Sequence, residues 1–244
     1  MITCIFRGRL GNHLDFIYTL FKYCKTYNID FDKISFPRYE KYRIPGRENY
    51  FVKECFPLYS EFVQSKFDKD YIDTRKMKTL FRKDLKVNCK DNFYLYLFGA
   101  VIRDYSDLDL IEQLFYNKKN YDKVYEVRNY LGNNLGIHIR RGDFLNHKEY
   151  ANLIVSKEKY KEMIKNNADK FDKIVIFSDS LKWCKENLEN EYKDKVIFDE
   201  SKLAYEGMIR MSSCKDIIMN NGSSYSKWSK ILSPIVRRIY EVKE

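Results

Sequence analysis

Short apolar runs alternate with amphipathic segments through the second half of the chain, and this alternation constrains the fold more than any other feature. Four such runs follow residue 133, namely LGIHIR, KIVIFSD, KVIFD and KDIIMN. The spacing of apolar residues around them predicts four helices, over 157–167, 181–188, 203–213 and 224–232. Continuous apolar strands that alternate with helices indicate a parallel sheet covered on both faces. The C-terminal half is therefore predicted to form a Rossmann-type α/β unit.

The first half of the chain begins with the same kind of pattern. ITCIF is expected to form a short buried strand, RGRLGNH a glycine-containing loop, and LDFIYTLFKYCKTY a helix. FDKISF and FYLYLF predict two further strands, and helices are expected over 50–56, 73–85 and 108–130, the last broken near 117–120. A second α/β unit is therefore predicted. We divide the chain into an N-terminal domain of residues 1–125 and a C-terminal domain of residues 126–244.

The charge of the chain favours an anionic partner. Lysine and arginine number 45 against 35 aspartates and glutamates, which gives a net charge of +10. Such a surface attracts nucleic acid, an anionic membrane or a small phosphorylated substrate, and composition does not choose among them. Hydrophobic residues make up 44% of the chain, which excludes an intrinsically disordered protein.

Cysteine usage and the N-terminus bear on the compartment. The six cysteines are scattered, without a C-x-x-C pair, so reduced cysteines packed as small apolar residues are expected, and no metal or disulfide framework. Arg7, Arg9 and Asp15 interrupt any apolar segment of leader or membrane-spanning length. The expectation is a cytoplasmic protein of bacterial or viral type, whose basic helices would allow loose contact with an anionic membrane. The oligomeric state is left open.

Polar motifs follow three of the predicted strands in the C-terminal half. HIRRGD ends the first strand, FSD ends the second, and NNGSSYS follows the last. In a parallel sheet, ligands bind outside the carboxyl ends of the strands, so the three motifs are expected to face one crevice. A helix starting at Ser223 or Ser224 would direct free backbone N–H groups at an anion there. A single Arg–Asp pair at a strand end is more often a surface ion pair than a binding site. Three polar motifs at successive strand ends favour a phosphate-binding site instead.

Individual side chains at these strand ends have expected roles. Arg140 and Arg141 are candidates for contacting a pyrophosphate, because an arginine fork matches its oxygens. Asp143 and Asp179 would accept hydrogen bonds from a base, a ribose or the arginines. His138 lies in an alternating apolar strand, which is more typical of a hydrogen-bonded core residue than of a base or ligand. The aspartates of YSDLDL stand at a predicted helix start and are expected to cap it rather than to bind a metal.

These segments together resemble a known family. HIRRGD is similar to the H-x-R-R-x-D signature of the metal-independent α-1,2-fucosyltransferases, glycosyltransferase family 11, and of the related α-1,6- and protein O-fucosyltransferases. FSDSLKWCKENL resembles the family's FSDD-x-x-W-x-K-x-x-L segment. The stretch from Ala204 to Leu232 resembles its E-x-x-x-x-M-S-x-C-K-x-x-I-x-x-NSSFSWW-x-x-W-L stretch, and RGRLGNHLDFIY resembles its GGLGNQ-x-F-x-Y opening. The matches run from Phe6 to Leu232 in the family's order.

Several positions depart from the family pattern. Gly222 stands where the family usually has asparagine, Lys227 replaces the first tryptophan, and Gly207 occupies a position that is often aspartate. His13 replaces glutamine, whereas Asp15 makes GRLGNHLD more similar to the protein O-fucosyltransferases. The resemblance therefore supports fucosyl transfer as a class more firmly than any one linkage or acceptor.

The resemblance implies a GT-B-like fold, with two Rossmann-type α/β units, the donor site on the C-terminal unit and the acceptor near the N-terminal one. It implies an inverting, metal-independent enzyme that moves fucose from GDP-fucose to a hydroxyl of a glycan acceptor, with α-1,2 linkage to galactose expected. No cofactor or metal is expected. The expected partners are the nucleotide-sugar donor and the glycan acceptor. The alternatives are an O-fucosyltransferase or a transferase of another GDP-sugar.

The resemblance also implies roles for residues in both halves. Arg140 would be the main diphosphate contact, and Arg141 would support it or anchor the loop. His138 and Asp143 would hold the nucleotide and the arginines, and Asp179 would contact the nucleotide. Ser223 and Ser224 would contact phosphate. The loop that contains Gly11 and Asn12 either closes over the donor or acceptor, or is a plain turn. The expected catalytic residues are Arg140, His138 and Asp15, and either Asp15 or His13 is a candidate general base.

Two other classes of protein share some of these sequence features. A nucleic-acid-binding module would fit the basic charge and the many tyrosines, but lysines alternate with acidic residues along the predicted helices and no nucleic-acid motif is present. No nucleic-acid partner is therefore expected. A phosphatase would fit a histidine beside arginines, but H-I-R-R lacks a nucleophile with a base in reach.

Overall fold

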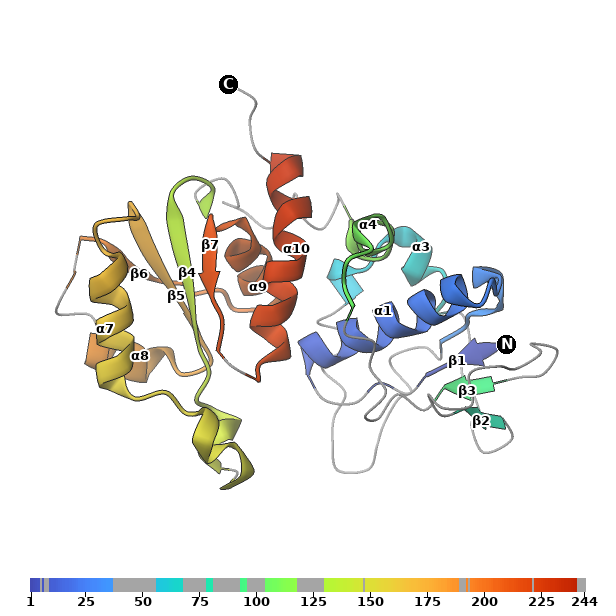
Figure 1. Cartoon of the computed structure of the whole chain (residues 1–244), viewed down its shortest axis with the longest axis horizontal. Coiled ribbons are helices and arrows are strands. Elements are labelled where there is room, and N and C mark those ends of the chain that lie inside the picture. The colour runs from blue at the N-terminus through green and yellow to red at the C-terminus, as the bar shows by residue number, and fades with distance from the viewer. Residues whose placement is uncertain are drawn as a thin grey trace. The chain divides into compact units, whose positions relative to one another are not determined.

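The computed structural model divides into two compact units, Met1–Asp122 and Lys123–Glu244. The structure describes residues 1–4, 6, 9–36, 56–67, 78–80, 93–95, 104–117, 130–146, 148–188, 192, 194–220 and 222–240. Both units combine a parallel sheet with helices, so the predicted α/β class is confirmed (Figure 1). The predicted boundary after residue 125 lies outside the described residues and stays a prediction.

The C-terminal unit contains a four-stranded parallel sheet in the order β6-β5-β4-β7. Its strands are β4 (Asn134–Ile139), β5 (Lys173–Ser178), β6 (Val196–Phe198) and β7 (Asp216–Ile218). Its α-helices are α7 (Lys157–Asn167), α8 (Leu181–Leu188), α9 (Ala204–Ser213) and α10 (Ser224–Tyr240). Figure 1 shows α7 and α8 on one side of the sheet and α9 and α10 on the other. The predicted doubly covered parallel sheet is confirmed.

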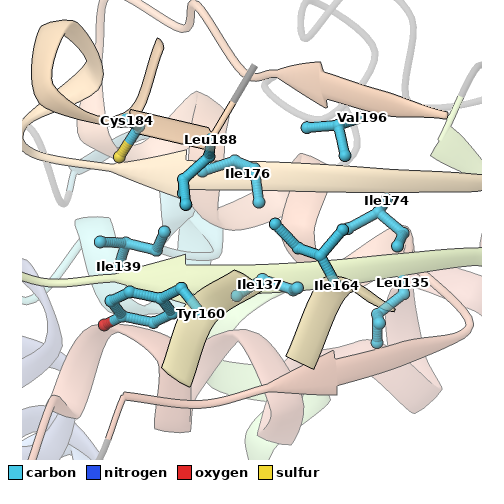
Figure 2. Packing of buried hydrophobic residues seen from close by; sticks show 10 residues of the cluster. All are labelled: Leu135, Ile137, Ile139, Tyr160, Ile164, Ile174, Ile176, Cys184, Leu188 and Val196. Atoms are coloured by element: carbon cyan, nitrogen blue, oxygen red, sulfur yellow. The ribbon is translucent and has the colours of Figure 1, made fainter. Parts of the chain in front are cut away.

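The core on the α7–α8 side is formed by alternate residues of the strands. Leu135, Ile137 and Ile139 of β4 point to this side and pack against Ile164 of α7 and Leu188 of α8 (Figure 2). The other face of β4 carries Gly136 and His138. A Cβ atom at 136 would lie 3.3 Å from two side chains of the α9 segment, so a glycine allows this close approach. Burial on both faces explains why the strands read as continuous apolar runs.

Helices α7 and α10 follow β4 and β7 in the chain, and the connection between β4 and α7 is itself helical. Two 3-10 helices, η6 (Asp143–Asn146) and η7 (Lys148–Leu153), lie between β4 and α7. The Ser156 side chain caps α7 by accepting a hydrogen bond from the Lys159 N–H at 3.2 Å, which explains where that helix begins. Helix α10 begins at Ser224 as predicted, but it continues past the predicted end at residue 232 to Tyr240.

The N-terminal unit contains a three-stranded parallel sheet in the order β1-β3-β2. Its strands are β1 (Ile2–Thr3), β2 (Lys78–Leu80) and β3 (Phe93–Leu95). Its helices are α1 (Leu10–Thr26), α3 (Glu61–Gln64) and α4 (Leu108–Phe115), with the 3-10 helices η1 (Phe31–Lys33) and η3 (Phe56–Leu58). Of the helix expected over 50–56, residues 50–55 lie outside the described residues, and Phe56 begins η3.

Three local predictions in this unit are wrong. The expected helix over 73–85 contains β2, because pairing with β3 provides backbone partners that local spacing does not reveal. The expected strand at FDKISF begins with η1, since the Asp30 carboxylate accepts a hydrogen bond from the Asp32 N–H and favours a turn. The predicted glycine loop is shorter than expected, because α1 already begins at Leu10.

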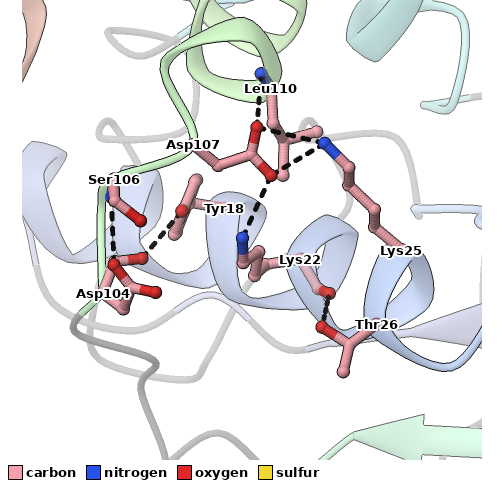
Figure 3. Close-up of polar contacts among 8 residues, drawn as sticks. All are labelled: Tyr18, Lys22, Lys25, Thr26, Asp104, Ser106, Asp107 and Leu110. Carbon is pink, nitrogen blue, oxygen red and sulfur yellow. Dashed lines mark hydrogen bonds and ion pairs between the residues drawn. The ribbon is translucent and has the colours of Figure 1, made fainter.

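Helices α1 and α4 are joined by a polar cluster that Figure 3 shows. The Tyr18 hydroxyl donates to the carbonyl oxygen of Asp104 at 2.7 Å. Asp107 caps α4 by accepting from the Leu110 N–H, as the sequence predicts, and its carboxylate pairs with Lys22 at 3.0 Å and Lys25 at 2.8 Å. Burial alone would raise the pKa of the Asp107 carboxyl, but the hydrogen bonds from both lysines lower it to about 2. The cluster therefore stabilises the packing of the two helices.

Among the helices that the structure describes, none combines the length and apolar composition required to cross a bilayer.

Candidate functional site

The carboxyl ends of three neighbouring strands bring the predicted donor-site motifs together. Strand β4 lies between β5 and β7, with Ile139 paired to Ser178 and Ile137 paired to Ile218. The segment that starts at Arg140, the residue Asp179 and the segment leading into α10 therefore leave the sheet at the same edge. This is the edge at which open parallel sheets bind ligands.

Asp179 holds the loop that follows β4. Its Oδ1 accepts hydrogen bonds from the backbone N–H groups of Arg141 at 2.9 Å and Gly142 at 3.1 Å. Its Oδ2 lies 3.1 Å from Nη1 of Arg140. Contact with the neighbouring arginine is one of the roles expected for this aspartate, whereas its contact with a nucleotide stays a prediction. The carboxylate fixes both the backbone of the loop and the guanidinium of Arg140.

Gly142 is a part of this site that the sequence analysis did not single out. A Cβ atom at this position would lie 2.5 Å from Oδ2 of Asp179 and 3.0 Å from its Cγ. Any side chain would therefore displace the carboxylate that holds the loop. The sequence shows a glycine directly after two arginines, but the reason that only glycine fits there is the contact with Asp179.

The two arginines of the loop lie in different environments. The guanidinium carbon of Arg140 is 5.6 Å from the ring centroid of Phe144, which is buried. The guanidinium carbon of Arg141 is 3.7 Å from the ring centroid of Trp183 on α8. Arg140 combines an ion pair with a distant ring, whereas Arg141 lies directly on an aromatic face.

His138 is buried at the end of β4, with 4% of its surface exposed. Burial and then the positive charge of Arg140 lower its pKa to about 3, so the imidazole is neutral near pH 7. Its ring centroid lies 5.2 Å from that of Tyr225. The expected burial is correct, but the expected hydrogen bond is not found at Nδ1, which has no partner in the described part of the chain. With a pKa this low, the neutral imidazole of His138 can still donate or accept a hydrogen bond, but it is a weak base.

The segment before α10 forms a tight turn. Gly222 has a φ of +82°, a conformation that favours glycine, and a Cβ there would lie 2.9 Å from Cδ1 of Leu153. The Ser223 N–H donates to the carbonyl of Asn220 at 3.1 Å, and the Ser223 carbonyl accepts the first helical bond, from Lys227. Ser224 is the first residue of the helix. The turn thus places both serines at the N-terminus of a 17-residue helix, where backbone N–H groups favour an anion.

The other predicted site residues lie in η6 and in α1. Asp143 begins η6, and its side chain lies outside what the structure describes, so its expected contacts stay predictions. In the N-terminal unit, Gly11 and Asn12 lie in the first turn of α1 rather than in a loop. Asp15 is buried in the same helix, and its Oδ1 accepts a hydrogen bond from the Tyr105 hydroxyl at 2.6 Å. His13 is buried two residues earlier, in the first turn of α1.

A second charged cluster lies where β6 ends, and sequence reasoning missed it. Asp199 is buried, and its Oδ1 accepts from the Tyr130 hydroxyl at 3.1 Å and from Nη1 of Arg210 at 3.2 Å. The same Nη1 donates to the Ser201 hydroxyl at 2.9 Å. The cluster holds the connection between β6 and α9 in place. No local motif marks it, since its members come from three separate segments.

Within the described ranges, no group of three or more histidine, cysteine, aspartate or glutamate residues is arranged to hold a metal ion. The positive groups that the site offers to an anion are the arginines at the end of β4 and the N-terminus of α10.

The chain is similar in sequence to two curated proteins of Escherichia coli. It is 33% identical to an alpha-1,2-colitosyltransferase over 103 residues, 39% of this chain and 35% of that protein. It is 30% identical to the O-antigen biosynthesis glycosyltransferase WbnK over 113 residues, 44% of this chain and 37% of that protein. The similar segments thus span little more than a third of either relative.

The fold is similar to solved structures across nearly the whole chain. A crystal structure of POFUT1 in complex with GDP-fucose superposes with a TM-score of 0.57 and 10% sequence identity, covering 94% of this chain and 93% of that one. This likeness supports the GT-B-like α/β fold that the sequence predicts. The sequence model of the family described as "Glycosyl transferase family 11" matches residues 30–238. Because that match includes both units and all three strand-end motifs, the chain belongs to glycosyl transferase family 11.

Proposed function

We propose that this protein is an inverting glycosyltransferase that moves fucose from GDP-fucose to a hydroxyl of a glycan acceptor, forming an α-1,2 linkage to galactose. The observation that carries the proposal is the loop of Arg140 and Arg141, held by Asp179 at the end of the central strand. The N-terminus of α10 follows the adjacent strand and supplies backbone donors to the same edge. Membership of glycosyl transferase family 11 supports the same reaction class.

The geometry suits stabilisation of a departing diphosphate. In an inverting transfer, the acceptor oxygen forms a bond to the anomeric carbon as the bond from that carbon to the phosphate oxygen breaks. Positive charge develops on the sugar and negative charge on GDP. The Arg140 guanidinium is already oriented by Asp179 and would bind the diphosphate oxygens without further reorganisation. Backbone N–H groups in the first turn of α10, which begins at Ser224, would add donors, so charge compensation needs no metal in this proposal.

Proton transfer from the acceptor hydroxyl is assigned to another residue than His138. With a pKa of about 3, His138 is too weak a base to take that proton near neutral pH. Its neutral ring instead supports the site through hydrogen bonding or packing beside Tyr225. Asp15 stays the proposed base, oriented by the hydrogen bond that it accepts from Tyr105.

A second candidate donor is a different GDP-linked deoxysugar. The similarity to an alpha-1,2-colitosyltransferase favours a colitosyl donor as the competitor. An O-fucosyltransferase acting on protein is a further alternative, supported by the likeness of fold to POFUT1. Both alternatives use the same diphosphate contacts, and they differ in the sugar and the acceptor.

The proposal is tested by calorimetric titration of the full chain, in EDTA, with GDP, GDP-fucose, GDP-colitose, GDP-mannose and UDP-glucose. Binding of GDP and GDP-fucose by the wild type, lost in Arg140→Ala, is the expected result. Lys182→Gln is the matched control, because Lys182 is exposed on α8 and pairs only loosely with Glu186 at 3.9 Å.

Turnover with galactose-terminated acceptors then separates the alternatives. If GDP-colitose binds more tightly than GDP-fucose and its sugar is transferred faster, colitose and not fucose is the sugar that the enzyme transfers. Absence of binding to every guanosine nucleotide by folded protein would overturn the proposal, and RNA and DNA binding would be measured next.

A further inference from the structure

We propose that Trp183 is a positioning residue, which fixes the arginine loop of the donor site by stacking under Arg141. The inference deepens the proposed function and rests on it, because the loop is the proposed diphosphate contact. It assigns a role to the aromatic face of α8, which would act through Arg141 without touching the substrate.

The stacking geometry is the first observation. The guanidinium carbon of Arg141 lies 3.7 Å from the centroid of the Trp183 ring, the separation of direct stacking. Among the residues whose side chains the structure describes, none makes a hydrogen bond or ion pair with this guanidinium. A long and flexible side chain is costly to order, so a packing surface that holds it matters. Trp183 provides that surface.

The second observation is that the start of α8 holds Arg141 at two points. Asp179, two residues before the helix, accepts the hydrogen bond of the Arg141 backbone N–H at 2.9 Å. Trp183, in the first turn of α8, holds the side chain of the same residue. With both backbone and side chain fixed, the preceding residue Arg140 keeps its orientation toward Oδ2 of Asp179.

The platform itself is rigid. Cys184 and Leu188 anchor α8 in the hydrophobic core (Figure 2), where Cys184 is fully buried. Trp183 packs against the same cluster. A loop held on a rigid element loses little conformational entropy when a ligand binds. Without the stack, the loop would lose conformational entropy when the donor binds, which weakens donor binding. The bound donor and the transition state would be weakened equally.

The test compares Trp183→Phe with Trp183→Leu, because Phe keeps an aromatic face whereas Leu fills space without one. Trp183→Leu is expected to weaken GDP binding by about tenfold, the effect of one partly desolvated cation–π contact. Trp183→Phe should recover most of the affinity. In turnover assays, KM for the donor should rise in Trp183→Leu while kcat changes little, the pattern of lost uniform binding. Lys182→Gln, the neighbouring exposed residue, is the matched control for α8.

A double-mutant cycle shows whether Trp183 acts through Arg141. Once Arg141→Ala is in place, adding Trp183→Leu should cause little further loss of GDP affinity. Full additivity of the two losses would overturn the proposal, as would a Trp183→Leu variant that binds GDP like the wild type. Equal losses in the Phe and Leu variants would show that only bulk matters, and would also overturn it.

Hydrogen exchange without ligand keeps this inference separate from the proposed function. The amides of Arg141 and Gly142 are both bonded to Asp179, so they should exchange faster in Trp183→Leu and recover in Trp183→Phe. Faster exchange in a protein that binds no guanosine nucleotide would overturn the proposed function while supporting the positioning of the loop. Unchanged exchange in a protein that binds GDP would overturn the positioning alone.

Discussion

Two aspartates, one in each unit, have similar hydrogen-bonding environments but different places in the fold. Asp179 accepts hydrogen bonds from two backbone N–H groups and pairs with Arg140. Asp107 accepts one from a backbone N–H and pairs with two lysines. Asp179 holds a loop at the carboxyl edge of a parallel sheet, whereas Asp107 caps α4 and holds it to α1. A well-satisfied carboxylate therefore marks a site only where the topology also exposes donors to a ligand.

The largest expected effect comes from Arg140, the cation that Asp179 orients. Arg140→Ala removes a donor aimed at developing charge, so turnover should fall by roughly 10²- to 10³-fold. Arg140→Lys should recover only part of this loss, because an ammonium lacks the planar fork. Steady-state kinetics with the donor varied measure the effect. If Arg140→Ala keeps wild-type turnover, the loop that Asp179 holds is not part of the active site. Asp179 would then be a purely structural residue like Asp107.

Replacing each aspartate with asparagine tests directly whether only Asp179 belongs to the donor site. Asp179→Asn removes the charge that pairs with Arg140, and GDP affinity should fall by roughly 10- to 100-fold, the worth of hydrogen bonds to a charged group. Asp107→Asn should leave GDP affinity unchanged. Calorimetry on both proteins at pH 7 makes the measurement. If the two variants lose affinity equally, the distinction between site and structural clamp is wrong.

The effect on stability should be concentrated in the N-terminal unit. Asp107→Ala removes the cap of α4 and both lysine pairs, so the free energy of unfolding should fall by about 1–2 kcal/mol. Asp107→Asn keeps a capping side chain and should lose less. Hydrogen exchange of peptides from α1 and α4 measures this, since both tryptophans of the chain lie in the C-terminal unit and fluorescence reports on that unit. Equal losses in the two variants would mean that charge, not capping, holds the helices.

Local pattern predicted the C-terminal unit well, because its strands and helices follow one another regularly. The helices over 157–167 and 181–188 match α7 and α8 to the residue. Their amphipathic spacing coincides with the packing they make, and Ser156 marks a helix start in sequence as well as in structure. The three strand-end motifs could be placed at one edge from topology alone.

The remaining features depend on contacts between segments far apart in the chain. Strand β2 pairs with β3, which local spacing does not reveal, so a helix was predicted in its place. The need for a glycine at 142 arises from Asp179, 37 residues away. The cluster of Asp199 and Arg210, and the stack of Arg141 on Trp183, likewise join side chains from different elements. Such contacts follow from packing and not from periodicity, so a single sequence does not predict them.

Each unit contains a group whose pKa is lower in the folded protein than in the unfolded chain. The pKa of Asp107 is about 2, below the unfolded value of about 3.9, so its stabilising effect is complete above pH 4 and is lost as pH falls through 2. The pKa of His138 is about 3, below the unfolded value of about 6.5. Between these two values the unfolded chain binds a proton that native His138 does not, so stability falls as pH decreases below 6.5.

The two units should therefore respond to mild acid differently. His138→Gln should reduce the loss of stability between pH 7 and pH 5, measured by urea unfolding with tryptophan fluorescence. Asp107→Asn should leave that loss unchanged, because its carboxyl does not titrate in this range. Because His138 does not titrate near pH 6.5, His138→Gln should leave the pH profile of donor affinity unchanged in that range. A His138 ring whose NMR signals titrate near pH 6.5 would contradict its neutral, buried state, and would restore it as a candidate base because a pKa near the working pH suits general base catalysis.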